Sequence, residues 1–318
     1  ISGANGPKTP EMTVRRMWEL LQRDAHPGLM SPADWALVAD RGAQACDARD
    51  GVTDGVAEDP RQCRFDIGTL ACPAGTARTS GQCLDAEQIA FARSFYTPLR
   101  DDSGRALDDG ILPGVLIDSG RSQLAIGTFG QAIRRLPSWD GKDFDAARDL
   151  AAIDRVMPEL RADDTDVHLF RQRGGKLLMY SGWMDGAVAA KMVVAYRDAL
   201  AAAAGGERKA DEFMRLYMLP GVQHCRGGPG ADQIGGSGQD GPEVDARHDL
   251  LTALEDWVEK GRAPASLVAS KLEGGAVRRT HLVCPYPQQA VYDGRGTPGE
   301  AASYRCAVSP AARGRASR

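Results

Sequence analysis

One stretch gives the strongest indication of the fold: Lys176-Leu177-Leu178-Met179-Tyr180-Ser181-Gly182-Trp183-Met184-Asp185. Its apolar part follows two glycines and is typical of a buried parallel strand. Toward the C-terminus, residues 187–204 have apolar side chains at helical spacing, residues 213–219 form a second buried-strand pattern, and residues 250–260 form an amphipathic helix. This order of strand, helix, strand and helix predicts an α/β fold with a parallel sheet.

Two strands are too few for an independent sheet, so we expect the chain to be N-terminally truncated, with the other strands preceding Ile1. Residues 1–7 are interpreted as the end of an early core segment, of which residues 1–4 end a strand. Residues 8–170 are predicted to be a large insertion, and residues 171–318 the C-terminal part of the core. We expect the isolated chain to fold poorly, because an apolar sheet edge would stay uncovered.

The insertion has an irregular composition. Four segments have apolar residues at helical spacing, at residues 13–24, 31–40, 85–96 and 145–157. The second begins with Ser31-Pro32, which is a helix start signal. Residues 46–84 are dense in Cys, Asp, Gly and Pro, and are predicted to be a loop region stabilised by cross-links and an ion.

The residues just past the two strands suit catalysis. Asp185 follows the first strand and His224 follows the second. The carboxyl ends of parallel strands meet at one edge, where doubly wound sheets place their functional groups. An acid followed by a histidine is the order of the last two members of an α/β-hydrolase triad. Alone, Asp185 also suits a helix N-cap and His224 a structural loop histidine, but their joint placement favours a catalytic pair.

No serine of the chain has the context of a nucleophile, which in this fold lies between a strand and a helix. Ser237 lies in a glycine-rich stretch but follows His224, and Ser181 lies on the strand of the acid. An elbow helix of ~12 residues and a turn would place the serine roughly 20 residues before Ile1.

The chain has seven cysteines, and six of them form three local pairs. The pairs are Cys46/Cys63, Cys72/Cys83 and Cys284/Cys306. No pair has a Cys-x-x-Cys spacing, so we interpret them as disulfides formed in an oxidising compartment. The alternative is buried free cysteines in a cytosolic protein. Cys225 is left over, and its partner is expected outside the chain.

A second constellation is Cys46-Asp47-Ala48-Arg49-Asp50-Gly51-Val52-Thr53-Asp54-Gly55-Val56. Three carboxylates within eight residues repel one another unless a cation or solvent separates them. The glycines allow a tight turn that directs carbonyl groups inward, and such hard oxygen ligands suit Ca²⁺. The loop is not an EF-hand, because no glutamate closes it. The alternative is an acidic, solvated turn.

Together these residues resemble the tannase and feruloyl esterase family, which includes the hydrolase of mono(2-hydroxyethyl) terephthalate. The resemblance covers nearly the whole chain and is carried by several blocks in the same order. The blocks are Cys46-Asp47-Ala-x-Asp50-Gly-Val-x-Asp54-Gly-Val, Cys83-Leu84, Gly182-Trp183-x-Asp185, Leu219-Pro220-Gly221-x-x-His224-Cys225, Trp257-Val258-Glu259-x-Gly-x-Ala-Pro, and Cys284-Pro285-Tyr286-Pro287-Gln288 with Cys306.

The resemblance implies an α/β-hydrolase core with a lid inserted before the strand of the acid. It implies structural calcium in the lid, bound by side chains of Asp47, Asp50 and Asp54 and by carbonyls of Val52 and Val56. It also implies the three disulfides named above, and a disulfide from Cys225 to a cysteine beside the missing serine. Residues 101–170 match poorly, so no substrate contact is assigned there.

Composition excludes other classes. Hydrophobic residues make up 42% and charged residues 26%, as in ordinary soluble globules. The net charge of −4 lacks the basic surplus of nucleic-acid-binding proteins, and no apolar run approaches the ~20 residues of a membrane span.

We therefore expect a secreted or periplasmic serine carboxylic-ester hydrolase acting on small aromatic esters, with Asp185 and His224 as its acid and base. The oligomeric state stays open. One alternative is an inactive, truncated relic that acts as a secreted calcium-binding protein. The other is a metal-dependent hydrolase with Asp185 and His224 as ligands, which the lack of paired histidine spacing disfavours.

Overall fold

The computed structural model describes residues 2–3, 6–117, 122–236 and 242–308. Its central sheet has three parallel strands in the order β1 (Ser2–Gly3), β2 (Leu177–Gly182) and β3 (Met214–Leu219). Both strands expected from the apolar runs are present, and the expected end of an earlier strand is β1. In the register of β2 and β3, Gly182 lies opposite Leu219, so both strands end at the same edge.

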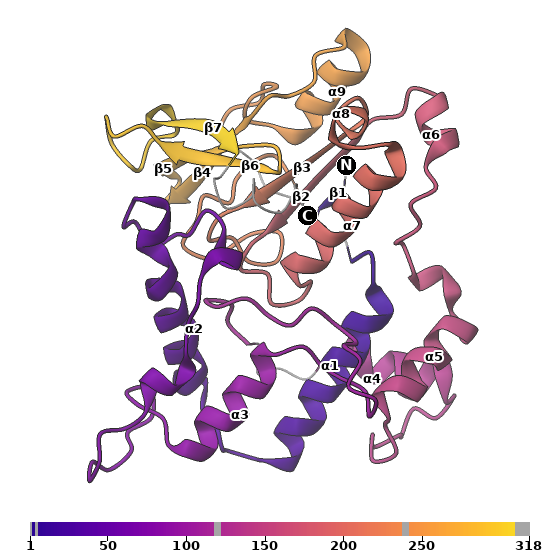
Figure 1. The fold of residues 1–318 in the computed structure, drawn as a ribbon, viewed down its shortest axis with the longest axis vertical. Coiled ribbons are helices and arrows are strands. Elements are labelled where there is room, and N and C mark those ends of the chain that lie inside the picture. Colours follow the sequence, from indigo (N-terminus) through magenta and orange to yellow (C-terminus); the bar gives the residue numbers. More distant parts are fainter. Residues whose placement is uncertain (1, 4–5, 118–121, 237–241, 309–318) are drawn as a thin grey trace.

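Helices cover both faces of this sheet, as an α/β fold requires. On one face, Met179 and Leu216 belong to the same buried cluster as Val193 of α7 (Ala190–Ala204). On the other face, Leu178 and Tyr217 pack in a cluster with Leu250 of α9 (Leu250–Lys260). In Figure 1, α7 crosses in front of β2 and β3. Alternate strand residues therefore point to opposite layers, and both layers are apolar.

Four further strands follow, which the sequence analysis did not predict. They form two antiparallel hairpins, β4 (Leu267–Glu273) with β5 (Ala276–Val283), and β6 (Gln288–Tyr292) with β7 (Tyr304–Val308). The first hairpin turns at Gly274-Gly275, where both φ angles are positive. Figure 1 shows the hairpins beside the central sheet, above α2 (Pro32–Asp47).

The insertion is mainly helical. Its helices are α1 (Thr9–Ala25), α2, α3 (Ala86–Tyr96), α4 (Gln123–Ile126), α5 (Ala146–Val156) and α6 (His168–Gln172), with a π-helical segment at Gly127–Ile133. Short 3-10 turns occupy Ala48–Asp50, Pro60–Gln62, Ile67–Leu70 and Pro158–Leu160, and outside the insertion Ala301–Ser303; the short helix α8 (Glu207–Ala210) precedes β3. All four helical patterns predicted there are present. Ser31 caps α2 by accepting from the Asp34 amide, as its start signal indicated.

Several predicted boundaries were wrong, and two of them concern the site. Helix α2 continues to Asp47, so the predicted loop region starts later than residue 46. Helix α7 starts at Ala190 and not at residue 187, because the amides of Ala187 and Val188 bind the Asp185 side chain. The residues after the acid therefore form a turn.

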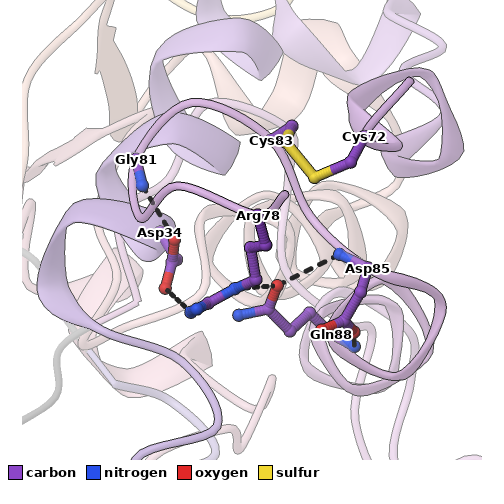
Figure 2. Close-up of a disulfide and its surroundings, with 7 residues drawn as sticks. All are labelled: Asp34, Cys72, Arg78, Gly81, Cys83, Asp85 and Gln88. Carbon is purple, nitrogen blue, oxygen red and sulfur yellow. Dashed lines mark hydrogen bonds and ion pairs between the residues drawn. A yellow bond between two sulfur atoms is a disulfide. The ribbon is translucent and has the colours of Figure 1, made fainter. Parts of the chain in front are cut away.

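All three predicted disulfides are present: Cys46–Cys63, Cys72–Cys83 and Cys284–Cys306. Figure 2 shows Cys72–Cys83 and the loop between the two cysteines. Within this loop Arg78 forms an ion pair of 3.1 Å with the buried Asp34 and donates to Gln88. The loop is thus fixed to α2 and α3 as well as closed by its cross-link.

Among the described residues, no helix is long and apolar enough to cross a membrane.

Candidate active site

The two residues predicted as acid and base meet at the carboxyl edge of the sheet. Asp185 follows β2 and His224 follows β3, and the Oδ2 atom of Asp185 lies 2.9 Å from Nδ1 of His224. With the proton on Nδ1, the imidazole donates to the carboxylate and leaves Nε2 as an acceptor. This is the hydrogen bond that orients the base in Ser-His-Asp triads.

The acid is fixed in place by its second oxygen. Oδ1 of Asp185 accepts from the amides of Ala187, at 2.7 Å, and Val188, at 2.8 Å. The side chain is fully buried, whereas the side chain of His224 is half exposed. Three hydrogen bonds therefore fix the acid in place, whereas the base stays accessible.

The backbone brings the two turns together. Trp183 donates its amide proton to the Leu219 carbonyl, and Met184 donates to Val222, at 3.0 and 2.9 Å. At Gly182 a Cβ atom would lie 2.1 Å from the Val222 carbonyl oxygen. Any side chain there would separate the turns, because such a contact is shorter than van der Waals separation.

Electrostatics act on His224 from two sides. The hydrogen bond that His224 donates to Asp185 raises the pKa of His224 above its usual 6.5, against the lowering effect of partial burial. The charge of Arg16, on α1 of the insertion, opposes this rise. The insertion therefore contributes a charge that acts on the base, which the sequence did not indicate.

Among the hydrogen bonds of the described residues, the side chain of His224 binds Asp185 and no serine. Ser181 is buried within β2, and its hydroxyl lacks a hydrogen-bond partner among the described residues. Ser237, the other serine considered, lies outside the described residues. The described residues thus provide an acid and a base without a nucleophile.

The Asp-rich loop begins at the end of α2. Oδ1 of Asp47 accepts from the amides of Asp54, Gly55 and Val56. This carboxylate therefore closes the loop by itself and draws its second half toward α2. Such local side-chain to backbone bonds are what favours aspartate in turns.

The other four predicted calcium ligands line one cavity of about 10 Å³, which is close to the smallest cavity that holds a single water molecule. They are Asp50, Val52, Asp54 and Val56. Burial raises the pKa of Asp50 to about 6, and the nearby carboxylates of Glu58 and Asp54 add to the rise. Asp47 does not line this cavity.

Three residues beside this cavity were missed by the sequence analysis. Glu58 and His281 line it and form a buried ion pair of 2.6 Å, and Arg279 forms an ion pair with Asp54. Burial alone would lower the pKa of His281, but the Glu58 carboxylate holds it above its usual value. These pairs join the Asp-rich loop to β5, more than 200 residues later in the chain.

A different group has the tightest metal-type geometry. In the described ranges, Glu243, Asp245 and His248 are the one group of three potential ligands with all ligand atoms within 4.8 Å of one another. Its two carboxylates are exposed and bind Nδ1 of His248 directly. Asp47, Asp50 and Asp54 do not converge in this way.

The fold and the site define an α/β protein with an acid–histidine pair at the carboxyl edge of its sheet. A family model described as tannase and feruloyl esterase matches residues 12–117 and 127–307, so the chain belongs to this family. The resemblance predicted from the sequence motifs is confirmed.

Individual relatives have related names. The chain is 29% identical over 290 residues to a probable feruloyl esterase B-2 of Aspergillus terreus, covering 88% of this chain and 55% of that protein. It is 30% identical over 307 residues to an uncharacterized esterase of Xanthomonas campestris pv. campestris, covering 83% and 53%. The chain thus spans about half the length of these relatives.

Solved structures share the fold. Feruloyl esterase B from Aspergillus oryzae matches with a TM-score of 0.88 at 24% identity, covering 96% of this chain and 63% of that one. An esterase from the same fungus matches with a TM-score of 0.83 at 28% identity and the same coverage. Tannin acyl hydrolase from Aspergillus niger matches with 0.75 at 19%, covering 96% and 59%.

Proposed function

We propose that the full-length protein is a serine carboxylic-ester hydrolase with an α/β-hydrolase core, acting on hydroxybenzoate- or hydroxycinnamate-type esters. The observation that carries this proposal is the hydrogen bond between the fixed carboxylate of Asp185 and Nδ1 of His224. Membership of the tannase and feruloyl esterase family supports the ester class.

His224 is the base and then the acid of this reaction. Its Nε2 takes the proton of a serine hydroxyl as the serine oxygen attacks the ester carbonyl, and Asp185 stabilises the imidazolium. The imidazolium returns the proton to the leaving alcohol, and an acyl-enzyme remains. Water then attacks the acyl group with the same proton transfers, which releases the acid and restores the serine.

The serine in this proposal comes from sequence preceding Ile1 in the full-length protein. Parallel pairing of β1 with β2 supports a core segment on that side. Cys225 directly follows His224 in the chain, so a cross-link at Cys225 would act on the base. A disulfide from Cys225 to a cysteine beside the serine would fix nucleophile and base together.

We also propose a structural Ca²⁺ in the lid formed by residues 8–170. The small cavity lined by Asp50, Val52, Asp54 and Val56 supports a single bound ion. Burial raises the pKa of Asp50 to about 6, and the nearby carboxylates of Glu58 and Asp54 add to the rise. Carboxylate and carbonyl oxygens are the ligands that Ca²⁺ takes. Asp47 is the fifth residue of the set and closes the loop. Calcium would neutralise the carboxylates and stabilise the lid.

The three disulfides support secretion, or export to the periplasm, because disulfides persist in oxidising compartments.

The test uses the full-length protein with methyl ferulate and methyl gallate as substrates. We expect a fluorophosphonate to abolish hydrolysis, and His224→Ala to lower kcat/KM by about 10³-fold or more, about the loss seen for other triad bases. His168→Ala is the matched control, because His168 also binds an aspartate through Nδ1 but is exposed on α6.

Two results would contradict the proposal. Hydrolysis that resists the fluorophosphonate and stops with a chelator would favour metal-dependent chemistry. A folded full-length protein that binds calcium and cleaves no ester would favour the non-catalytic alternative.

A further inference from the structure

The base lies on a loop, residues 220–231, that is closed by its own main chain. We call these residues the histidine loop. The amide of Gly230 donates to the Gly221 carbonyl at 3.1 Å, and the amide of Gln223 donates to the Gly227 carbonyl at 3.2 Å. Gln223 directly precedes the base, so the position of the base depends on how Gly227 is held.

The base needs support through its main chain. The side chain of His224 is half exposed, and its hydrogen bond to Asp185 orients it. The next residue, Cys225, has a φ of 62°, in the left-handed region that residues with a Cβ atom rarely adopt. Such a conformation persists where the surrounding structure holds it. We therefore looked for contacts that fix the histidine loop from outside.

Asp232 provides one such contact. It is buried, with 5% of the residue exposed, and its Oδ2 atom accepts from the amide of Gly227 at 2.7 Å. The amides of Asp232 and Gln233 donate to the carbonyl of Ser270 at 3.1 and 2.9 Å, and the amide of Ser270 donates back to Gln233 at 3.0 Å. Ser270 is a buried residue of β4. The carboxylate thus joins the histidine loop to a strand of the core.

Lys271, the next residue of β4, provides a second contact. Its Nζ atom donates to the Gly228 carbonyl at 2.8 Å and lies 3.4 Å from Oδ1 of Asp232. Oδ1 is buried and has no hydrogen bond within the described ranges, so the ammonium group supplies its counter-charge. A buried carboxylate needs such a partner. One ion pair therefore holds two successive glycines of the histidine loop, one by its amide and one by its carbonyl.

We propose that Asp232 and Lys271 are positioning residues, which keep the imidazole of His224 on the catalytic acid by holding the histidine loop. For its effect on catalysis the proposal rests on the proposed ester hydrolase function. Both side chains act through the loop and not on the reacting atoms. A shift of about 1 Å in a catalytic group, caused from a distance, is enough to slow a reaction about 100-fold.

The first test needs no turnover. An NMR titration measures the pKa of His224 in the full-length protein, in Asp232→Ala and in Lys271→Met, and the spectrum of His224→Ala identifies the signal. The hydrogen bond to Asp185 raises this pKa, and the charge of Arg16 lowers it. A loosened loop weakens that hydrogen bond, so we expect the pKa to fall in both variants.

The two variants separate positioning from a direct effect of charge. Loss of a carboxylate would by itself lower the pKa of a nearby imidazole, whereas loss of an ammonium group would raise it. Shifts in opposite directions in Asp232→Ala and Lys271→Met would therefore overturn the proposal. An unchanged pKa of His224 in a folded Asp232→Ala protein would overturn it as well.

The second test measures kcat and KM for methyl ferulate. We expect Asp232→Ala to lower kcat about tenfold or more with little change in KM, because a displaced base slows the chemical step. The rise of kcat with pH should also move to lower pH. Asp232→Asn keeps an oxygen for the Gly227 amide and should recover part of the loss. A kcat equal to that of the wild type in a folded Asp232→Ala protein would contradict the proposal.

Asp149 of α5 provides the matched control. It is also buried, accepts from the amide of Asp145 at 3.0 Å and forms an ion pair of 2.9 Å with Arg134, all within the insertion. Asp149→Ala should lower the unfolding temperature but leave kcat and the pKa of His224 unchanged. Equal effects of Asp149→Ala and Asp232→Ala on both quantities would show a general loss of stability and overturn the proposal. A wild-type protein that cleaves no ester would refute the proposed function, while the two pKa shifts would still decide the positioning role.

Discussion

Replacing Asp185 by asparagine should inactivate the site without unfolding it. The asparagine side chain is expected to keep its one oxygen for the amides of Ala187 and Val188, because those two bonds fix the side chain. Its NH₂ group must then take the place of Oδ2 and face Nδ1 of His224. An NH₂ group donates, so Nδ1 must become the acceptor and the imidazole proton must move to Nε2. The base then has no lone pair for the serine.

The magnitude follows from the loss of the correct tautomer. The matching substitution in other triads costs about 10⁴ in kcat, and we expect a similar loss in the full-length protein. The pKa of His224 should fall, because the carboxylate that raises it is gone. The free energy of unfolding should hardly change. Asp185→Ala also removes the acceptor of two amides and should cost about 1–2 kcal/mol.

Three measurements check this reasoning. They are kcat/KM for methyl ferulate, an NMR titration of His224, and thermal unfolding. A loss of activity below tenfold would refute it, as would an unchanged pKa of His224 in a folded Asp185→Asn protein. Equal unfolding temperatures of the Asp185→Asn and Asp185→Ala proteins would refute the anchoring role of the two amides.

Three further predictions concern pH, calcium and cross-links. Since only the neutral imidazole accepts the serine proton, kcat/KM should rise with pH through the pKa of His224, above 6.5, and Asp185→Asn should move this rise to lower pH; a pH-independent rate would contradict it. Removing the proposed calcium with a chelator should lower the Tm by about 5 °C or more, because occupancy at 100 times Kd adds about 2.7 kcal/mol. In the Asp50→Asn protein the chelator should have little effect on the Tm. A decrease as large as that of the wild-type protein would argue against Asp50 as a calcium ligand. Replacing Cys72 and Cys83 by serine should lower the free energy of unfolding by up to about 3 kcal/mol, since the disulfide closes a loop of sequence separation 11. Chemical denaturation measures this free energy. An unchanged value would show that the contacts of Arg78 fix the loop without the disulfide.

The core elements were predictable because their patterns are local. Helix α9 has a capping Asp249, an amphipathic body and Gly261 at its end, and its bounds match the prediction. Strands β2 and β3 are buried on both faces, so they show as unbroken apolar runs. Asp185 and His224 come soon after those runs, so parallel pairing predicted that they lie at the same edge of the sheet.

The C-terminal hairpins were missed because their pattern is not periodic. Strand β5 contains Arg279 and His281, which look like solvent-exposed residues in the sequence. In the structure His281 is buried against Glu58, and Arg279 is partly buried against Asp54. No local signal joins residues so distant in the chain. The sequence did contain one hairpin signal, the Gly274-Gly275 pair between the two short segments that form β4 and β5. Arg16 was missed for the same reason, since only the folded insertion places α1 near the base.

Gly182 makes the spacing of acid and base a property of the main chain. It carries no functional group, yet it allows the Val222 carbonyl to approach the end of β2. In a saturation-mutagenesis library selected for ester cleavage, this position should tolerate no other residue, while neighbouring core positions accept alternatives of similar volume. An intolerant site would then mark where two backbone segments touch, and an inactive Gly182→Ala protein would still contain every chemical group that the reaction needs.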